Sequence, residues 1–203
     1  MKLYYLPGAC SLASHIALRE AGASFDLDRL DKATNKTAAG EDFLAINPKG
    51  YVPTLKLDGG EVLTEGAAIL QYIADQNPTA GLAPTAGTLE RIRLQEYLNY
   101  VATELHKSFS PLFKPDTAEA EKEAAKKRVA QRLDLVETWL ADGRQYLLGD
   151  RFSVADAYLF VIANWTGPTG IGLQRWPHIA AFQQRVAQRQ AVQAALKAEG
   201  LAA

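Results

Sequence analysis

Short stretches of alternating apolar and polar residues fill the first 80 positions, and they predict a small mixed sheet. The run Lys2–Leu6 is aromatic and apolar and stops at a Pro-Gly pair, which is typical of a strand that ends in a turn. Asp58-Gly59-Gly60 separates two further runs and is a strong hairpin signal. Apolar residues at helical spacing lie between these runs. Strands are expected at residues 2–6, 25–30, 54–57 and 61–63, and helices at 10–22 and 65–75.

From Thr88 onward the strand-like pattern disappears and helical patterns remain. Leu94, Leu98, Val101 and Leu105 recur at steps of four, three and four, which places them on one face of a long helix. Further helices are expected at 119–140, from a capping box at Ser153–Asp156, from Pro177 and from Ala191.

The change of pattern divides the chain. Residues 81–87 hold two glycines and one proline between two helical patterns, which makes them the best linker candidate. A sheet-containing part followed by helices indicates an α+β protein of two domains, at residues 1–80 and 88–203.

Composition narrows the class of protein. The 203 residues include 22 Lys and Arg against 23 Asp and Glu, a net charge of -1 that gives no general attraction for nucleic acid or anionic membranes. The longest apolar runs are too short to span a bilayer. One cysteine excludes a disulfide within the chain and suits the cytoplasm. Three scattered histidines and one cysteine predict no metal site, and His15 is expected to pack or hydrogen-bond on the first helix.

Cys10 stands where the first strand gives way to the first helix. A thiolate at that junction faces open backbone N–H groups and the positive end of the helix dipole. Lowering a thiol pKa by two units requires about 2.7 kcal/mol. The dipole supplies only about 0.3–1 kcal/mol, so backbone N–H groups, Ser11 or a cation must supply the rest. The alternative is a buried, inert cysteine. Without a CxxC pair, any oxidised state needs an external thiol.

Two short motifs around the hairpin have a structural and a functional interpretation. Val52-Pro53 at the start of a strand is a turn in most proteins, whereas a cis bond would present the Val52 backbone to an extended peptide. Thr64 and Glu65 open a helix, with Thr64 at the N-cap on the structural interpretation. On the functional one, Glu65 receives a ligand ammonium and the following N–H groups, from Gly66 onward, receive a carboxylate.

Asn99, Thr103 and His106 are spaced by four and three, which predicts one polar stripe on the long helix. Such a stripe is usually a solvated face. Lys107 next to His106 adds positive charge that would favour a neighbouring thiolate.

Five motifs follow one another over nearly the whole chain. They are Tyr4-Tyr5…Pro7-Gly8-Ala9-Cys10-Ser11, Asn47-Pro48-Lys49-Gly50-Tyr51-Val52-Pro53, Leu63-Thr64-Glu65-Gly66-Ala67, Glu104-Leu105-His106-Lys107 and the capping motif Gly149–Tyr158. Together, and in this order, they resemble the bacterial, beta-class glutathione S-transferases.

The resemblance implies a thioredoxin-like N-terminal domain that binds glutathione, an all-helical C-terminal domain that binds an electrophile, and a homodimer. It implies that Cys10, Ser11 and His106 serve catalysis. The glutathione-binding residues it implies are Cys10, Asn35, Tyr51, Val52, Pro53, Glu65, Gly66, Asn99, Thr103 and His106, some of them reaching the glutathione of the neighbouring subunit.

The chain departs from the family pattern at Asn35, where many relatives have a lysine that pairs with the glycyl carboxylate; Lys36 stands next to it. Tyr5 resembles the tyrosine used by other transferase classes, but its place within a strand favours packing. Candidates for the electrophile pocket are Phe109, Phe113 and Trp165, which are equally interpretable as core aromatics.

The expected activity is transfer of glutathione to small apolar electrophiles, with thiol-transferase or peroxidase side activity through a Cys10 mixed disulfide. Two alternatives remain: a non-catalytic carrier or binding protein of the same fold, and a dedicated glutathione-dependent disulfide reductase. No cofactor other than glutathione as cosubstrate is expected.

Overall fold

The computed structural model describes residues 1–201 and divides into two compact units, Met1–Ala83 with Gln188–Ala203, and Pro84–Ala187. The division after Ala83 falls within the expected linker at 81–87. The predicted helical domain ran from 88 to 203, whereas the final helix groups with the first unit. Residues 202–203 lie outside the described part of the chain.

The first unit is built on a five-stranded sheet in the order β3-β2-β1-β4-β5. β1 (Lys2–Tyr5) runs parallel to β2 (Asp26–Asp31) and antiparallel to β4 (Thr54–Lys56), which pairs with β5 (Val62–Thr64). The four predicted strands are thereby confirmed. β3 (Lys36–Thr37) was missed, because two residues are too few to show a period.

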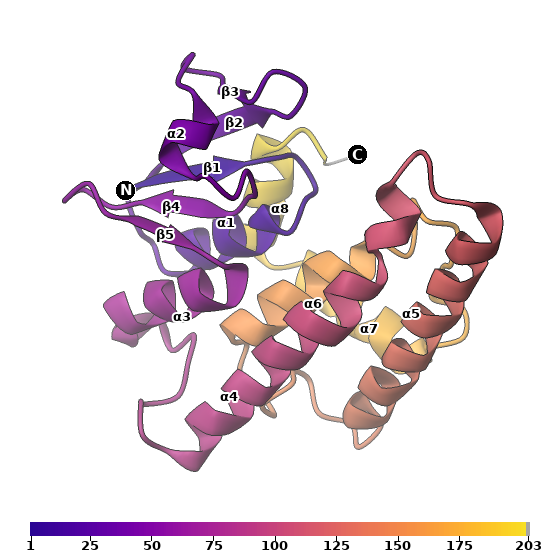
Figure 1. Ribbon diagram of the computed structural model, residues 1–203. Helices are drawn as coiled ribbons and strands as arrows, with labels where there is room; N and C mark the ends of the chain where they lie inside the picture. The colour runs from indigo at the N-terminus through magenta and orange to yellow at the C-terminus, as the bar shows by residue number, and fades with distance from the viewer. Residues whose placement is uncertain (202–203) are drawn as a thin grey trace. The chain divides into compact units, whose positions relative to one another are not determined.

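Helices cover this sheet, and α1 (Ser11–Glu20) is buried on more than one of its faces. The helix is buried from Ser11 to Leu18, since it contacts β1, α3 (Gly66–Gln76) and α8 (Gln190–Ala198). α8, yellow in Figure 1, lies beside α1. Val192 and Ala195 of α8 are fully buried, which explains why this helix belongs to the first unit. Two short helices, α2 (Phe43–Ile46) and η1 (Pro78–Ala80), complete the unit.

The second unit is entirely helical among its described residues. α4 (Leu89–Tyr100) continues into a π-helical segment, η2 (Val101–His106), followed by η3 (Ser110–Phe113), α5 (Glu119–Leu140), α6 (Val154–Asn164) and α7 (Pro177–Ala187). The predicted stripe is confirmed, because Leu94, Leu98, Val101 and Leu105 are all fully buried. α6 is buried over ten consecutive residues, Val154–Ala163, and forms the centre of the unit.

The predicted capping box at the start of α6 is present. Asp156 accepts hydrogen bonds from the Ser153 N–H at 2.8 Å and the Ser153 hydroxyl at 2.7 Å, and its other oxygen accepts the Leu147 N–H at 2.8 Å. Burial raises the pKa of Asp156 to about 6, against the opposing effect of these hydrogen bonds. One carboxylate therefore satisfies three donors in the core of the second unit.

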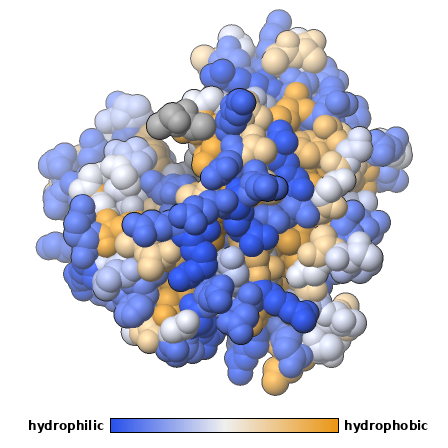
Figure 2. Space-filling model, turned by 180° about the vertical axis from the view of Figure 1, so that it is seen from behind, coloured by the Kyte–Doolittle hydropathy of each residue, from blue (hydrophilic) through white to orange (hydrophobic). Residues whose placement is uncertain are grey.

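Hydrophilic residues cover most of the face in Figure 2, with apolar residues showing between them. The described residues contain no helix long and apolar enough to cross a membrane.

Candidate functional site

The turn between β1 and α1 positions the single cysteine. The Ala9 N–H bonds the Leu6 carbonyl at 3.1 Å, with Pro7 and Gly8 between them. Gly8 has φ +69°, which a type II turn requires at its third residue and which glycine adopts without strain. The turn places Cys10 at the N-cap of α1, as the sequence predicted.

Cys10 is partly exposed, and its Sγ donates to the Val52 carbonyl at 3.2 Å. Cys10 is thus not a buried core residue, and the N-terminus of α1 meets the loop before β4. The Val52–Pro53 bond is cis, which answers the question that the sequence left open.

Ser11 is fully buried, and its hydroxyl is used within the turn. It accepts the Leu6 N–H at 3.2 Å and lies 3.3 Å from the Leu6 carbonyl. These bonds assign Ser11 a part in holding the turn, and its predicted catalytic part stays a prediction.

The loop that carries Val52 is fixed from within. Asn47 is buried and donates to the Tyr51 carbonyl and to the Thr54 hydroxyl, both at 2.9 Å. Pro53 is buried, whereas the Tyr51 side chain is 73% exposed. The backbone at Val52 is therefore held by a buried amide, while Tyr51 is presented to solvent.

Glu65 is the N-cap of α3, where the structural interpretation had placed Thr64. Its φ of 68° is unusual for a residue with a side chain, and such strain costs on the order of 1–3 kcal/mol. Lys49 donates to Glu65 at 2.7 Å and to Thr64 at 3.1 Å. Both Lys49 and Glu65 are largely exposed, so the ion pair is weak and exchangeable. Sequence reasoning did not single out Lys49.

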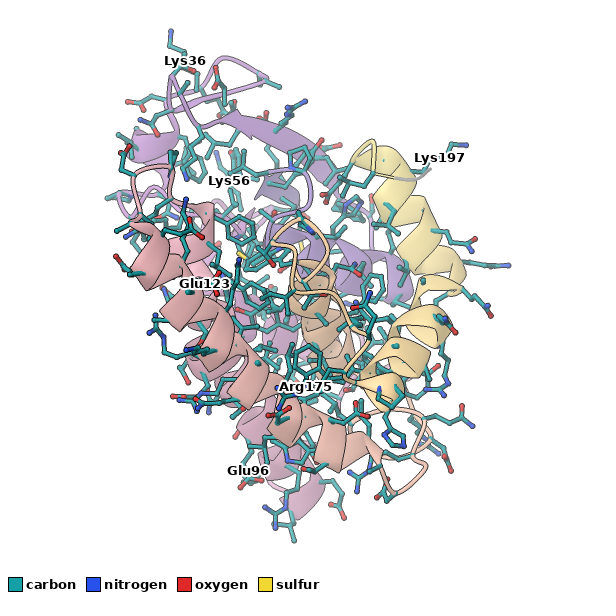
Figure 3. All side chains as sticks on the ribbon, turned by 90° about the vertical axis from the view of Figure 1, so that its right-hand side faces the viewer. Lys36, Lys56, Glu96, Glu123, Arg175 and Lys197 are labelled. Atoms are coloured by element: carbon teal, nitrogen blue, oxygen red, sulfur yellow. The ribbon has the colours of Figure 1, made fainter. Side chains whose placement is uncertain are left out.

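Asn35 lies in the turn between β2 and β3 and has φ 55°, a conformation that asparagine tolerates. Its carbonyl accepts the Phe43 N–H at 2.9 Å. Lys36 is exposed and extends outward from the chain (Figure 3). Of the two neighbours, the lysine is the one with a cationic, exposed side chain.

In the second unit, the predicted polar stripe extends into the π-helical segment η2. Asn99 and Thr103 are exposed, and the Thr103 hydroxyl bonds the Asn99 carbonyl at 3.0 Å. His106 instead is half-buried, with Nδ1 2.8 Å from the Tyr158 hydroxyl. The three predicted residues therefore differ in exposure, with two at the surface and His106 packed against α6.

Burial, followed by the charge of Lys107, lowers the pKa of His106 to about 4. The imidazole is therefore neutral near pH 7, and it can offer a hydrogen bond but no positive charge. Tyr158, its partner on α6, was not singled out, because a tyrosine among mostly apolar helical residues gives no pattern of its own.

His106 borders an aromatic cluster formed by Phe109, Phe113 and Trp165. Trp165 is central: its ring lies 4.9 Å from His106, 5.7 Å from Phe109 and 5.1 Å from Phe113, in edge-to-face geometry. Phe109 is fully buried, while Phe113 is 49% exposed. The three predicted electrophile residues are thus in mutual contact, with Phe113 at the solvent side.

The described residues contain no group of three or more His, Cys, Asp or Glu side chains that could hold a metal ion. The chemistry available is that of a thiol, a carboxylate, a neutral imidazole and helix N-termini.

Comparison with known proteins identifies the family. The model of the glutathione S-transferase N-terminal domain matches residues 8–76, and that of the C-terminal domain matches residues 100–190. The glutathione S-transferase GstA of Escherichia coli O157:H7 is 49% identical over 201 residues, covering 99% of this chain and all of the relative. The chain belongs to the glutathione S-transferase family.

Solved structures of this glutathione S-transferase family agree with the fold. A sphingomonad glutathione S-transferase complexed with glutathione has a TM-score of 0.96 and 53% identity, and each chain is covered fully. The beta-class glutathione S-transferase of Sphingomonas chungbukensis has a TM-score of 0.96 and 52% identity, covering 99% of this chain and all of the other. The predicted fold, a thioredoxin-like domain with a helical domain, is confirmed, and so is the resemblance to the beta class.

Proposed function

We propose that this chain transfers the thiolate of glutathione to small apolar electrophiles. The observation that carries the proposal is the contact between Cys10 Sγ and the Val52 carbonyl, which joins the N-terminus of α1 to the loop before β4. A helix N-terminus beside an exposed backbone edge suits a short peptide that ends in a thiol.

The first unit would bind glutathione along this edge. The backbone of Val52, next to Pro53 and beneath Tyr51, would pair with the cysteinyl residue. Glu65 would receive the γ-glutamyl ammonium in place of Lys49, and the Gly66 N–H at the start of α3 would receive the neighbouring carboxylate. An exposed and strained acidic N-cap supports this role, because strain at a non-glycine residue gathers at functional sites.

At the other end of the peptide, the glycyl carboxylate needs a cation or donor. Asn35 and Lys36 are adjacent, and Lys36 is an exposed cation. We assign the ion pair to Lys36 and a hydrogen-bonding part to Asn35.

In the reaction the glutathione thiolate forms a bond to carbon, and the leaving group departs with its electron pair. The thiol proton is lost to solvent before attack. The N-terminus of α1 stabilises the thiolate, and Cys10 lies in the same turn. Ser11 would act by holding that turn, and His106 would act as a neutral hydrogen-bond donor.

The second unit would supply the apolar surface for the electrophile. Trp165 with Phe113 and Phe109 offers aromatic edges and faces, of which Phe113 is the accessible one. Asn99 and Thr103 are exposed, which suits their expected part at the glutathione of a neighbouring subunit in a homodimer. We also assign the protein to the cytoplasm, where glutathione keeps a lone cysteine reduced.

Cys10 supports a side activity. Attack of its thiolate on the glutathione sulfur of a mixed disulfide RS–SG would give a protein–glutathione mixed disulfide and release the thiolate RS⁻; a glutathione thiolate would then regenerate Cys10 and release glutathione disulfide. The partly exposed thiol supports this exchange.

The test measures conjugation of glutathione to an activated aryl halide by the purified protein, with Cys10→Ala as the variant. A glutathione transferase shows turnover above the uncatalysed rate, and Cys10→Ala retains part of it. Turnover absent in both proteins, with glutathione still bound, would support a carrier. Disulfide reduction that disappears in Cys10→Ala, without any conjugation, would support the dedicated reductase. Light scattering would report the subunit number.

A further inference from the structure

A groove in the first unit lies outside the residues assigned to glutathione, where α1 ends and α8 begins. Its volume is about 720 Å³, which is in the range of small-molecule sites. Arg19 and Glu20 at the end of α1 line it, together with Arg189 and Ala191 at the start of α8. Cys10 lies at the other end of the ten-residue helix α1, on the order of 15 Å away. The groove is therefore separate from the thiol.

Three charged side chains line this groove, and two of them neutralise each other. Arg189 donates to both oxygens of Glu20, at 2.6 and 2.9 Å, and only 12% of the Glu20 side chain is exposed. The third charged side chain is that of Arg19. The groove thus carries one net positive charge.

The Arg19 side chain is already held in place in the absence of a ligand. Its Nε donates at 2.8 Å to Nε2 of the fully buried His15, which confirms the predicted hydrogen bonding of this histidine on the first helix. The guanidinium also lies 5.8 Å from the centre of the Phe25 ring. Among residues 1–201, Nη1 and Nη2 of Arg19 make no hydrogen bond or ion pair. A guanidinium that is fixed in this way loses little freedom when its remaining N–H groups bind an acceptor.

The rest of the groove wall is largely apolar. Phe25 is half-buried, and its ring meets the His15 ring edge-on with 5.7 Å between their centres. Ala23, Ala191 and Ala194 are also half-buried and present methyl groups to the groove. Such a wall favours an aromatic ring, which can pack edge-to-face or offset against Phe25.

One planar cation beside an apolar wall selects the chemistry of the ligand. Nη1 and Nη2 of a guanidinium match the two oxygens of a carboxylate, and a single carboxylate would neutralise the groove. A phosphate dianion would bring one negative charge too many, and a neutral ligand would leave the Arg19 guanidinium without an anionic partner.

We propose that this groove is a binding site for small aromatic carboxylates, with the carboxylate on Arg19 and the ring against Phe25. The site goes beyond the proposed transferase function. It shares no residue with the proposed glutathione site or with the aromatic cluster around Trp165.

The first experiment locates the ligand. The probe is 2-naphthoate, an aromatic monocarboxylate, which is titrated into the purified protein saturated with glutathione while backbone amide signals are followed by NMR. The signals of Gly22, Ala23 and Ala191 should shift and saturate. Saturable shifts that are absent from these residues, or that occur only around Trp165, would overturn the proposal.

The matched variants are Ala194→Glu and Gln193→Glu. Each places one new carboxylate on α8, but only residue 194 lines the groove, and Gln193 is exposed outside it. Ala194→Glu should weaken naphthoate binding about tenfold or more, because the new carboxylate repels the ligand and competes for Arg19. Gln193→Glu should bind like the parent. Parental affinity in Ala194→Glu, or an equal loss in both variants, would show that the ligand binds elsewhere.

The role of the guanidinium is tested from both partners. Arg19→Lys keeps the charge but replaces the two Nη groups by one ammonium, so the affinity for naphthoate should fall about fivefold. The neutral analogue 2-naphthamide should give no saturable shift in the groove of the parent. An Arg19→Lys variant with parental affinity, or an amide that binds as well as the carboxylate, would contradict the assignment of the carboxylate to Arg19.

The naphthoate site and the transferase function can fail separately. Naphthoate binding in the groove of a protein that conjugates nothing would retain the site and reject the transferase function. Conjugation by a protein whose groove binds no naphthoate would reject the site and retain the transferase function.

Discussion

The Cys10 turn of the first unit and the His106 cluster of the second are built in different ways. Around Cys10 the backbone makes the site: a glycine turn, the Val52 carbonyl and the N-terminus of α1. Around His106 packed side chains make it, with Trp165 at the centre of edge-to-face contacts. A site made of backbone fixes one ligand chemistry, whereas a cluster of rings accepts any apolar surface of suitable size.

The difference suits the two proposed ligands. Glutathione is constant and polar, and each of its ends requires a matching donor or acceptor. Electrophiles vary, and aromatic rings bind them through area and edge contacts with little directional demand. Changes in the first unit should therefore alter the KM of glutathione, and changes in the aromatic cluster should alter the KM of the electrophile.

The largest effect is expected from the buried carboxylate that supports α6. Asp156→Ala would leave the Leu147 N–H and two groups of Ser153 buried without acceptors. At roughly 1 kcal/mol or more for each group, the second unit should lose on the order of 3 kcal/mol of unfolding free energy. Urea unfolding followed by circular dichroism would measure it.

The control is Asp116→Ala, an exposed acid of the same unit, which should unfold like the parent. If Asp156→Ala unfolds at the same urea concentration as the parent, α6 does not need its capping box. The stability of the second unit would then not depend on the hydrogen bonds to this side chain.

The second-largest effect is expected at Glu65, the carboxylate at the start of α3. Glu65→Gln removes the charge that would pair with the γ-glutamyl ammonium, which is worth about 2 kcal/mol. The KM of glutathione should rise roughly ten- to hundredfold while the KM of the electrophile stays constant. Initial rates at varied glutathione would show this.

Glu61→Gln on the neighbouring hairpin is the matched surface change, and it should leave both KM values as they are. Should Glu65→Gln alter the electrophile KM equally, the assignment of the two ligands to the two regions would be wrong.

The sequence predicts an element of these regions correctly when its hydrophobic pattern is long enough to show a period. The buried stripe from Leu94 to Leu105 spans several turns and was predicted correctly. The two residues of β3 were missed, since no period can appear in so short a segment. The π-helical segment was missed as well, because its buried positions, Val101 and Leu105, also fit α-helical spacing.

Contacts between residues far apart in the sequence could not be predicted. The amphipathic pattern of α8 shows that one face is buried, but it cannot say against which helix. The Glu199 carboxylate accepts the Gly8 N–H at 3.0 Å across 191 positions of sequence, and no local rule links the two residues. Cys10 could be singled out because the helix N-terminus beside it is local in the sequence; the Val52 carbonyl that its thiol contacts is 42 positions away.

A pH effect on stability comes from His106. Its folded pKa of about 4 lies below the ordinary value of 6.5, so the unfolded chain binds the proton more readily. The stability this contributes is complete above pH 6.5 and is lost as pH falls toward 4.

The pH dependence from Asp156 has the opposite sign. Because its pKa is raised to about 6, its contribution to stability is complete below about pH 4 and is lost as pH rises through 6.

Because the two groups oppose each other, the test compares the parent with His106→Gln at each pH. The difference in unfolding free energy should move by about 3 kcal/mol in favour of the parent between pH 4 and 7. Tyr158→Phe should keep that dependence, because burial is the first cause and the hydroxyl is not. A flat difference for His106→Gln would show that the imidazole is solvated.

The smallest effect is expected at the aromatic cluster. Trp165→Phe keeps an aromatic ring but removes part of its contact area with His106 and Phe113, which should cost about 1 kcal/mol of electrophile binding. The KM of an aromatic electrophile should rise about fivefold, and that of glutathione should not change. The control is Trp139→Phe. Trp139 is in edge-to-face contact with Tyr97 and Tyr100, outside the aromatic cluster, and its substitution should change neither KM. Equal effects of the two substitutions would mean that Trp165 serves the core alone, and the electrophile surface would have to be sought on other side chains.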